Sequence, residues 1–373
     1  MEHWRSRYQQ SHTSFGKSDG VPLALTTRHA VSATGSYLLM GLPSLSPLFR
    51  IAIILFFLLP LPSPLFAQDI HFSQLDVNPI LNNPAYAGFF DGIGRAGISY
   101  RSQWASVSKH FQTIAASAEL SLLRRRYNRD GLSASVFFYN DRAGTLHYGT
   151  TAGNFILSYY KVLGSQNSTF LSVAAEVGIG QSGFTTDDIL FSDPSEDIAT
   201  TNTDFYTLGV GVAWFHQPFD DFYIKIGASG RNLNRPNISY LQLDSTYLER
   251  KLSIYSRAEY RAWANVSIMP VVGIMVQKKY REILFGADAK WYLAESSSRL
   301  LTFSGGIHYR WRDAATIELA MEYNAWIFAL SYDANLSRLT PASKTVGAME
   351  LGIVYRIQKQ KQVRRKAMPC PIM

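Results

Sequence analysis

From Gly94 onward, hydrophobic and polar residues alternate along segments of ~10 residues, and turn-forming residues separate the segments. In residues 171–179, one face would carry Leu, Val, Ala, Val and Ile, and the opposite face Ser, Ala, Glu and Gly. Residues 285–291 and 301–311 alternate in the same way. A period of two predicts β-strands, and many short strands separated by turns predict an all-β chain.

Fourteen segments show this pattern, and an even number is typical of antiparallel β-barrels that bacteria build from one chain. They are residues 94–104, 111–120, 130–139, 152–161, 169–180, 204–214, 222–230, 252–261, 266–277, 282–291, 300–311, 314–323, 325–333 and 346–357. An even count places both ends of the barrel on one side of the membrane, which is the periplasm for an exported chain.

The connections agree with this orientation, because outer-membrane barrels have long external loops and short periplasmic turns. The long connections that would lie outside are 181–203, 231–251 and 334–345. The shorter connections that would face the periplasm are 162–168, 215–221, 262–265, 292–299 and Asn324.

A soluble sandwich also alternates, so the pattern needs a second signal. Many apolar faces end in tyrosine or tryptophan, as in the aromatic girdles at the edges of a barrel's lipid band. These residues are Trp104, Trp214, Trp291, Tyr309, Trp311, Tyr323 and Tyr355. The opposite faces carry charged residues and glycine, which suit a wet lumen. We therefore predict a transmembrane antiparallel β-barrel over residues 94–357.

The residues before the barrel contain an export signal. Arg50 precedes the apolar run 51–59, and prolines follow it up to Ala67. A basic residue, a short apolar core and a small residue are typical of a cleaved signal peptide. The alternative is a single membrane anchor, for which the run is short. We predict a leader and signal over residues 1–67, with Met40 as a possible true start because residues 1–39 are polar.

Composition and charge exclude several classes of protein. Of 373 residues, 47% are hydrophobic and 17% are charged, which excludes a disordered chain. The single cysteine, Cys370, excludes internal disulfides and multi-cysteine metal sites. The net charge of +8 comes from the chain ends, because the part between residues 68 and 357 has 26 basic and 26 acidic residues. A nucleic-acid partner is therefore not expected.

The predicted basic tail, residues 358–373, would lie in the periplasm. It is either a solvated end or a contact for an acidic partner or anionic lipid. Cys370 in this tail could form a mixed disulfide with a partner.

Motifs for catalysis are missing from the sequence. His147, His216 and His308 have no metal-type spacing, and neither a Gly-x-Ser-x-Gly elbow nor a phosphate-binding loop occurs. The acidic pairs 187–188 and 220–221 fall in predicted turns. We expect no catalytic, metal or cofactor site, and hence no enzyme.

The segment that precedes the first strand contains two Asn-Pro pairs, at Asn78 and Asn83. Proline lacks an amide donor and pushes the preceding residue toward extended geometry, so the sequence argues against a helix or a central strand here. Residues 68–93 are therefore either a tether or an extended plug or docking strip at the periplasmic mouth, anchored by Phe72, Tyr86, Phe89 and Phe90. The residues predicted to dock a partner are Phe72, Gln74, Asn78, Pro79, Asn83, Pro84, Tyr86, Gly88 and Trp104.

The last strand carries a second candidate signal. Glu350, Gly352, Tyr355 and Ile357 follow the order polar, glycine, aromatic, apolar, which is similar to the C-terminal signal that the bacterial barrel-assembly machinery reads. The alternative is one more alternating strand.

The N-terminal motifs resemble those of a known family. Phe72-Ser73-Gln74, Asn78-Pro79, the run 83–88 (Asn-Pro-Ala-Tyr-Ala-Gly) and the run 100–104 (Tyr-Arg-Ser-Gln-Trp) resemble, in order and spacing, the opening of the PorP/SprF family of Bacteroidetes outer-membrane proteins. Weaker likenesses follow at 139–141, 331–333, 350–355 and 370–371, and Leu75-Asp76 departs from the pattern.

This resemblance implies a fourteen-stranded barrel of the type IX secretion and gliding motility apparatus, without catalysis. The implied partners are outer-membrane lipid, periplasmic secretion components and a secreted adhesin or other cargo. The alternative function is a passive pore or transporter for small solutes, for which the lumen residues would be Glu176, Arg257, Asp288, Lys290 and Glu318.

Overall fold

The computed structural model describes most of the chain after residue 69. The described residues are 70–90, 92–103, 111–124, 130–144, 148–163, 168–184, 202–239, 246–296, 299–337, 340 and 345–358. The chain divides into the units Met1–Pro62 and Ser63–Met373, and every described residue belongs to the second. The predicted signal peptide, Trp104 and the tail with Cys370 lie outside the described residues.

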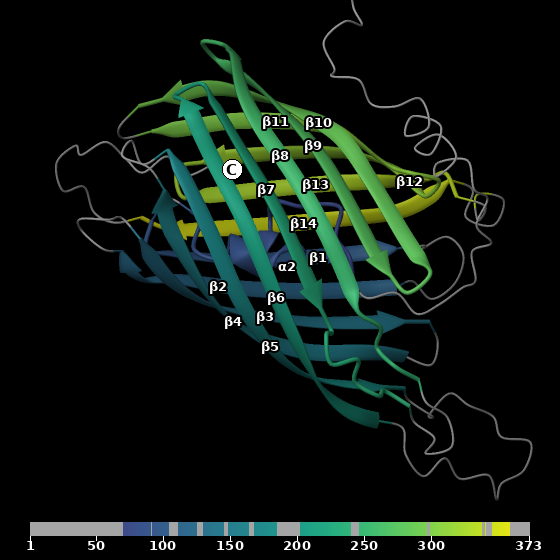
Figure 1. The fold of residues 1–373 in the computed structure, drawn as a ribbon. Coiled ribbons are helices and arrows are strands. Elements are labelled where there is room, and N and C mark those ends of the chain that lie inside the picture. The colour runs from purple at the N-terminus through teal and green to yellow at the C-terminus, as the bar shows by residue number, and fades with distance from the viewer. Residues whose placement is uncertain are drawn as a thin grey trace, which may run out of the picture. The chain divides into compact units, whose positions relative to one another are not determined.

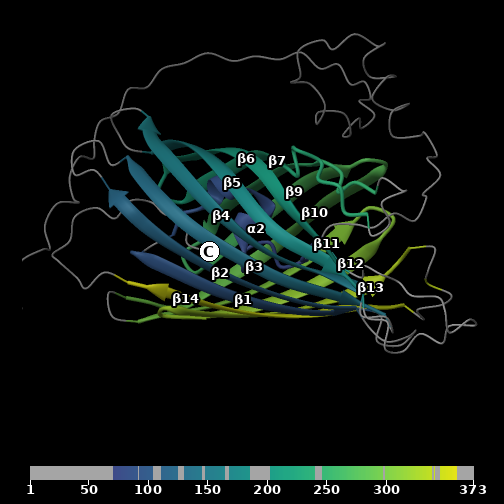
Figure 2. The ribbon, with the colours of Figure 1, turned by 90° about the horizontal axis from the view of Figure 1, so that it is seen from below.

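Fourteen antiparallel strands close into one barrel, as Figures 1 and 2 show. They are β1 (Gly94–Gln103), β2 (Phe111–Arg124), β3 (Gly131–Ala143), β4 (Tyr148–Leu163), β5 (Thr169–Gly183), β6 (Asn202–Phe219), β7 (Phe222–Arg231), β8 (Lys251–Trp263), β9 (Val266–Gln277), β10 (Tyr280–Glu295), β11 (Leu300–Arg310), β12 (Ala314–Tyr323), β13 (Trp326–Asn335) and β14 (Val346–Ile357). Each strand pairs with its neighbours in sequence, and β1 also pairs with β14, with Gly94 opposite Ile357. The predicted fold class and strand number are confirmed.

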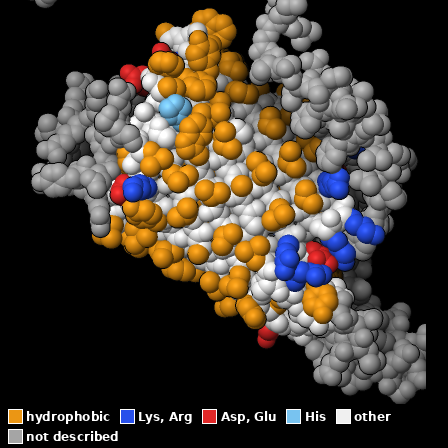
Figure 3. Space-filling view, in the orientation of Figure 1, with side chains coloured by type: hydrophobic (Ala, Val, Ile, Leu, Met, Phe, Trp, Pro, Cys, Tyr) orange, Lys and Arg blue, Asp and Glu red, His pale blue; other side chains and the backbone are white. Residues whose placement is uncertain are grey.

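Alternation along each strand separates an apolar exterior from a polar interior. On β5, Val173, Val177 and Ile179 are exposed, whereas Ala174 and Glu176 between them are buried. Exposed aliphatic and aromatic side chains cover the outer wall in Figure 3, and they form the surface that meets hydrocarbon. Within the described residues, no helix has both the length and the apolar character needed to cross a membrane.

Aromatic rings gather near the strand ends, as the sequence predicted. At the turn between β12 and β13, Trp326 and Tyr355 are half-exposed, and their ring centroids lie 4.6 Å apart. The turn itself is Asn324-Ala325, and Asn324 adopts a φ of 53°, which asparagine tolerates better than most residues. Its side-chain oxygen accepts a hydrogen bond from the Leu300 amide at 2.9 Å, so this turn also fixes the start of β11.

One strand carries a proline in its middle. Pro270 lies on the outer face of β9 and pairs normally with Ala287 of β10. On the other side, the β8–β9 pairing is interrupted between Arg257–Val271 and Tyr260–Ile268, because Pro270 has no amide proton to donate.

The connections divide less simply than the sequence predicted. The end expected to face outward has long connections, but it also has the short turns 278–279 and 311–313. The short turns 220–221, 264–265 and 324–325 lie at the opposite end. The assignment of the two ends to the cell exterior and the periplasm stays a prediction.

The segment before β1 lies inside the barrel and contains two single turns, α2 (Pro79–Asn82) and the 3-10 turn η1 (Pro84–Tyr86). The prediction of an extended segment without helix was therefore wrong. Each proline stands at the first helical position, where no intrahelical amide bond is lost. In η1, the Asn83 side chain accepts the Ala85 amide at 2.8 Å. Figures 1 and 2 both place α2 within the ring of strands, rather than at the mouth.

Candidate functional site: the lumen and the segment that fills it

We call residues 70–90 the plug. Its first anchor is Glu350 of β14, whose side chain is fully buried. The Glu350 carboxylate accepts the Ser73 amide at 2.8 Å and the Gln74 amide at 3.0 Å. The Gln74 side chain donates to the Glu350 carbonyl at 3.1 Å. Two plug residues are thus hydrogen-bonded to one wall residue, and the charge of the carboxylate strengthens the bonds from their amides.

The same carboxylate belongs to a buried network of charges around Ser73. Arg101 of β1 forms ion pairs with Glu350 and, at 3.2 Å, with Asp333. Arg310 of β11 donates to the Ser73 hydroxyl oxygen and to Asp333, each at 2.7 Å. The Ser73 hydroxyl in turn donates to Asp333 at 2.8 Å. Four wall strands therefore converge on one serine of the plug.

A second anchor of the plug is Asp76. Its carboxylate contacts Arg257 of β8 at 2.7 Å and Lys225 of β7 at 3.2 Å. Burial opposes ionisation of Asp76, but these two cations outweigh it and hold the pKa of the carboxyl below its usual range. Arg95 of β1 donates to the carbonyl oxygens of Asp76 and Val77, at 2.5 and 2.8 Å.

The two asparagines of the Asn-Pro pairs bind the wall directly. Asn78 donates to Ser99 at 2.7 Å and accepts from Ser117 at 2.5 Å, which links the plug to β1 and β2. Asn83 donates to the Val212 carbonyl of β6 at 2.9 Å. An asparagine side chain has both a hydrogen-bond donor and an acceptor. Asn78 uses its amide nitrogen to donate to Ser99 and its oxygen to accept from Ser117.

Aromatic side chains fill the end of the plug that leads into β1. The Phe89 ring stacks on Phe215 of β6, with centroids 3.7 Å apart and planes 7° apart. Tyr86 meets Phe215 edge-on at 5.9 Å, and the Lys225 ammonium lies 5.3 Å from the Tyr86 ring centre. Phe72 and Phe90 are buried as well. All four aromatic anchors predicted from the sequence are thus buried.

Glycines in the wall make room for the plug. A Cβ atom on Gly211 would lie 2.2 Å from the Asn83 side-chain oxygen, and one on Gly352 would lie 2.4 Å from the Gln74 side-chain oxygen. Gly97 and Gly227 stand against the plug in the same way. Such distances are too short for any side chain, so these strand positions need glycine for close approach.

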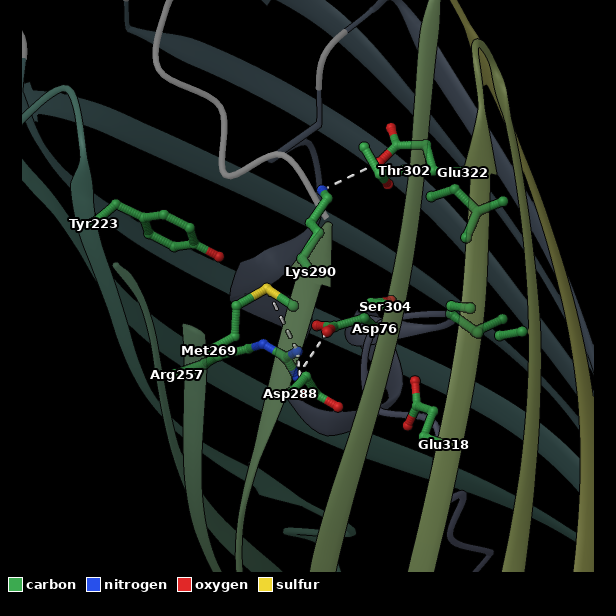
Figure 4. Close-up of a pocket in the computed structure, with 14 residues that line it drawn as sticks. Asp76, Tyr223, Arg257, Met269, Asp288, Lys290, Thr302, Ser304, Glu318 and Glu322 are labelled. Carbon is green, nitrogen blue, oxygen red and sulfur yellow. Dashed lines mark hydrogen bonds and ion pairs between the residues drawn. The ribbon is translucent and has the colours of Figure 1, made fainter. Parts of the chain in front are cut away.

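A cavity lies beside Asp76, between the plug and strands β7 to β13 (Figure 4). Arg257, Asp288, Lys290 and Glu318 line it, so four of the five lumen residues predicted for a pore meet there. Arg257 pairs with Asp288 at 2.6 Å in addition to Asp76. Lys290 and Glu322 also pair there, at 3.2 Å. The fifth predicted residue, Glu176, instead pairs with Arg231 at 2.8 Å.

The residues predicted to dock a partner lie in the lumen. Those from Phe72 to Gly88 are buried against the wall, and Trp104 lies outside the described residues. Partner docking by these residues stays a prediction, and direct contact would require the plug to leave the barrel. Of the predicted assembly signal, Glu350 and Gly352 face the plug, whereas Tyr355 and Ile357 face outward. Its role in assembly also stays a prediction.

Some of the wall residues that hold the plug could have been predicted from the sequence. Arg101 and Asp333 belong to runs that resemble the family motifs, so they could have been proposed as partners of the segment. Arg310 and Lys225 had no signal beyond a charged side chain on an inward face. Among the described residues, no group of three or more histidine, cysteine, aspartate or glutamate side chains is placed to hold a metal ion.

His71 makes the stability of the plug sensitive to pH. It lines a small cavity beside Lys251, and its Nε2 atom is buried without a hydrogen-bond partner among the described residues. Burial, followed by the charges of Arg101, Arg310 and Lys251, lowers the pKa of His71 well below the usual value, although Asp333 opposes this shift. The folded protein therefore keeps His71 neutral.

Below a pH of about 6.5, the unfolded chain binds a proton at His71 that the folded chain does not, so stability falls as pH falls. We expect His71→Gln to reduce this loss between about pH 7 and pH 5 by up to about 1.4 kcal/mol per pH unit. Urea unfolding in detergent at both pH values measures this loss of stability in the wild type and in the variant. An equal loss in the wild type and the variant would contradict the assignment.

The chain matches one family profile, described as "Type IX secretion system membrane protein PorP/SprF", over residues 65–355. No curated protein matches it. Among solved structures, the monoaromatic hydrocarbon channel CymD aligns with a TM-score of 0.47 at 10% identity, covering 77% of this chain and 94% of that one. The toluene transporter TbuX of Ralstonia pickettii aligns with a TM-score of 0.45 at 9% identity, covering 76% and 94%.

The family description names a membrane protein of type IX secretion. A closed antiparallel barrel with an apolar exterior is the architecture of bacterial outer-membrane proteins, so this protein is located in the outer membrane. Because the profile matches most of the chain, this protein belongs to the PorP/SprF family of type IX secretion system membrane proteins.

Proposed function

We propose that the protein is a closed, non-enzymatic barrel of the type IX secretion and gliding apparatus, which anchors periplasmic machinery, supports surface display of secreted adhesins, or does both. The observation that carries this proposal is the plug. Buried charges and asparagines bind it to the wall, and wall glycines fit around it. A lumen filled in this way supports a scaffold better than a passive solute pore.

The plug also gives the barrel the mechanical properties that an anchor needs. Its contacts reach β1 and β2, β6 to β8, and β11, β13 and β14. Strands on opposite sides of the barrel are therefore joined through the lumen as well as around the wall. Force applied to a loop or turn at one end would be shared by the whole barrel.

The proposed function predicts that the purified full-length protein carries no steady current in a planar lipid bilayer. The plug anchors of the wild type close the lumen, and Glu350→Ala, which removes the acceptor of the Ser73 and Gln74 amides, should produce intermittent openings. Single-channel recording measures the current through the wild-type protein and the openings of the variant. Steady open current through the wild-type protein would contradict the proposal and favour the pore.

Crosslinking in cells that carry a tagged, full-length protein separates the two scaffold roles. Recovery of periplasmic secretion components supports anchoring, and recovery of a secreted adhesin supports display. A silent barrel that recovers neither kind of partner would contradict both roles.

A further inference from the structure

Basic side chains gather at one edge of the outer wall. We call them the basic rim, and they are Arg235, Arg250, Lys278, Lys279, Arg281 and Arg312. All six are exposed. Five lie in three neighbouring connections at the same end of the barrel, and Arg281 lies at the adjoining start of β10. Figure 3 shows blue side chains around a red one where the apolar wall ends. The described parts of these connections hold two acidic residues, Glu249 and Asp313, so positive charge is in excess.

The basic rim lies at the edge of the exposed apolar surface of the wall. Arg250 directly precedes β8, where Leu252 and Ile254 are more than half exposed on the outer face. Arg281 shares the outer face of β10 with Phe285, and Arg312 follows the exposed Trp311. The cations therefore stand where the lipid-facing surface ends, next to an interfacial tryptophan.

The charges are held in place by contacts within the rim. Glu249 accepts from Arg235 at 2.9 Å and from Lys278 at 3.1 Å, which joins two connections. The Arg235 guanidinium lies 5.2 Å from the centre of the Tyr247 ring. Arg250 donates from its Nε atom to the Leu233 carbonyl at 2.9 Å. Such contacts reduce the entropy that these side chains would lose on binding a ligand.

The backbone of the rim is also unusual for tight connections. Arg235, Lys278 and Arg312 have φ values of 46°, 53° and 60°. Glycine or asparagine is favoured at such positions, and a side chain like lysine is strained there. Turn formation alone therefore does not explain why these three positions are basic.

We propose that the basic rim binds the phosphate groups of a phosphorylated glycolipid in the adjoining membrane leaflet. Arginine binds phosphate through several hydrogen bonds and lysine through a compact charge, so a rim of both suits headgroups with more than one phosphate. The apolar wall below would contact the acyl chains of the same lipid. On the predicted orientation, this leaflet is the outer one. The inference does not depend on the proposed function.

The test is native mass spectrometry of the full-length protein in detergent micelles, titrated with diphosphorylated lipid A. The rim variant carries Lys278→Asn, Lys279→Gln and Arg281→Gln, and Lys278→Asn also relieves the strained backbone. The control variant removes three exposed cations elsewhere, by Arg142→Gln, Lys161→Gln and Arg299→Gln. We expect binding to weaken by at least about tenfold in the rim variant and by less than about twofold in the control.

Two further probes identify the ligand. Lipid A without its phosphates should bind the wild type as weakly as intact lipid A binds the rim variant, and inorganic phosphate alone should not bind. Equal losses in the rim and control variants would overturn the proposal, as would equal binding of the dephosphorylated lipid. Tight binding of inorganic phosphate would overturn a lipid as the ligand. Electrophoretic mobility before and after heating verifies that each variant remains a folded barrel.

Discussion

Replacing Glu350 by alanine should lower the free energy of unfolding by about 3–5 kcal/mol and release the N-terminal half of the plug, because removing one partner of a buried ion pair leaves the other charge uncompensated. Among the described residues, Arg101 would keep Asp333 as its one acidic partner, and the amides of Ser73 and Gln74 would lose their acceptor. Urea unfolding in detergent measures the first effect, and hydrogen exchange of residues 70–78 measures the second.

A matched control separates release of the plug from general instability. Glu322 is also buried and pairs with two cations, Lys290 and Arg356. Both of these cations belong to wall strands, so Glu322→Ala should destabilise the barrel while the plug amides stay protected. If hydrogen exchange of the plug were equal in the two variants, Glu350 would not be its anchor.

The sequence predicted the strands well because alternation reports directly on the two environments of a membrane barrel. In residues 171–179, every second side chain meets lipid, and the intervening ones meet a polar lumen. The predicted first and last residues of the strands were less accurate. β4 begins at Tyr148 rather than residue 152, and β6 continues to Phe219 rather than residue 214. Beyond the lipid band both faces are partly polar, so the alternation fades while the backbone pairing continues.

The plug was harder to place from the sequence. Four aromatic residues in a short segment indicated a fixed structure, and their burial agrees with that inference. The side of the wall on which the segment lies depends on contacts such as Ser73 with Glu350, which are 277 residues apart. No local pattern carries that information. The Asn-Pro pairs misled the prediction, because proline at the first position of a turn is compatible with a helix.

The charged lumen was likewise predicted only in part. Inward-facing positions identified Arg257, Asp288, Lys290 and Glu318 as neighbours of one space. The alternative function predicted from the sequence placed these charges along an open pore, whereas the structure pairs Arg257 with Asp76 of the plug. An alternating pattern predicts whether each charged side chain faces the lumen or the lipid. Which charges form ion pairs depends on the strand register and on the segment that lies in the lumen.

Replacing Gly211 by valine should displace the middle of the plug and lower the free energy of unfolding by about 1–3 kcal/mol, as expected for overpacking. A side chain at this position would meet the Asn83 oxygen at 2.2 Å, the Pro84 ring at 2.9 Å and the Ala85 amide nitrogen at 3.0 Å. The proline and the backbone cannot rotate away, so the plug must move. Urea unfolding and hydrogen exchange of residues 79–86 measure the two effects.

A glycine on the outer wall provides the control, because the same change to valine there meets no plug residue. Gly153 lies on the outer face of β4, and a Cβ atom there would have no heavy atom within 4 Å. Because valine favours strands and suits a lipid-facing surface, Gly153→Val should leave stability unchanged or raise it, and the plug should remain protected. Equal behaviour of the two valine variants would mean that the wall glycines do not fit the plug. A loss confined to Gly211→Val would show that the barrel and its N-terminal segment form one packed unit.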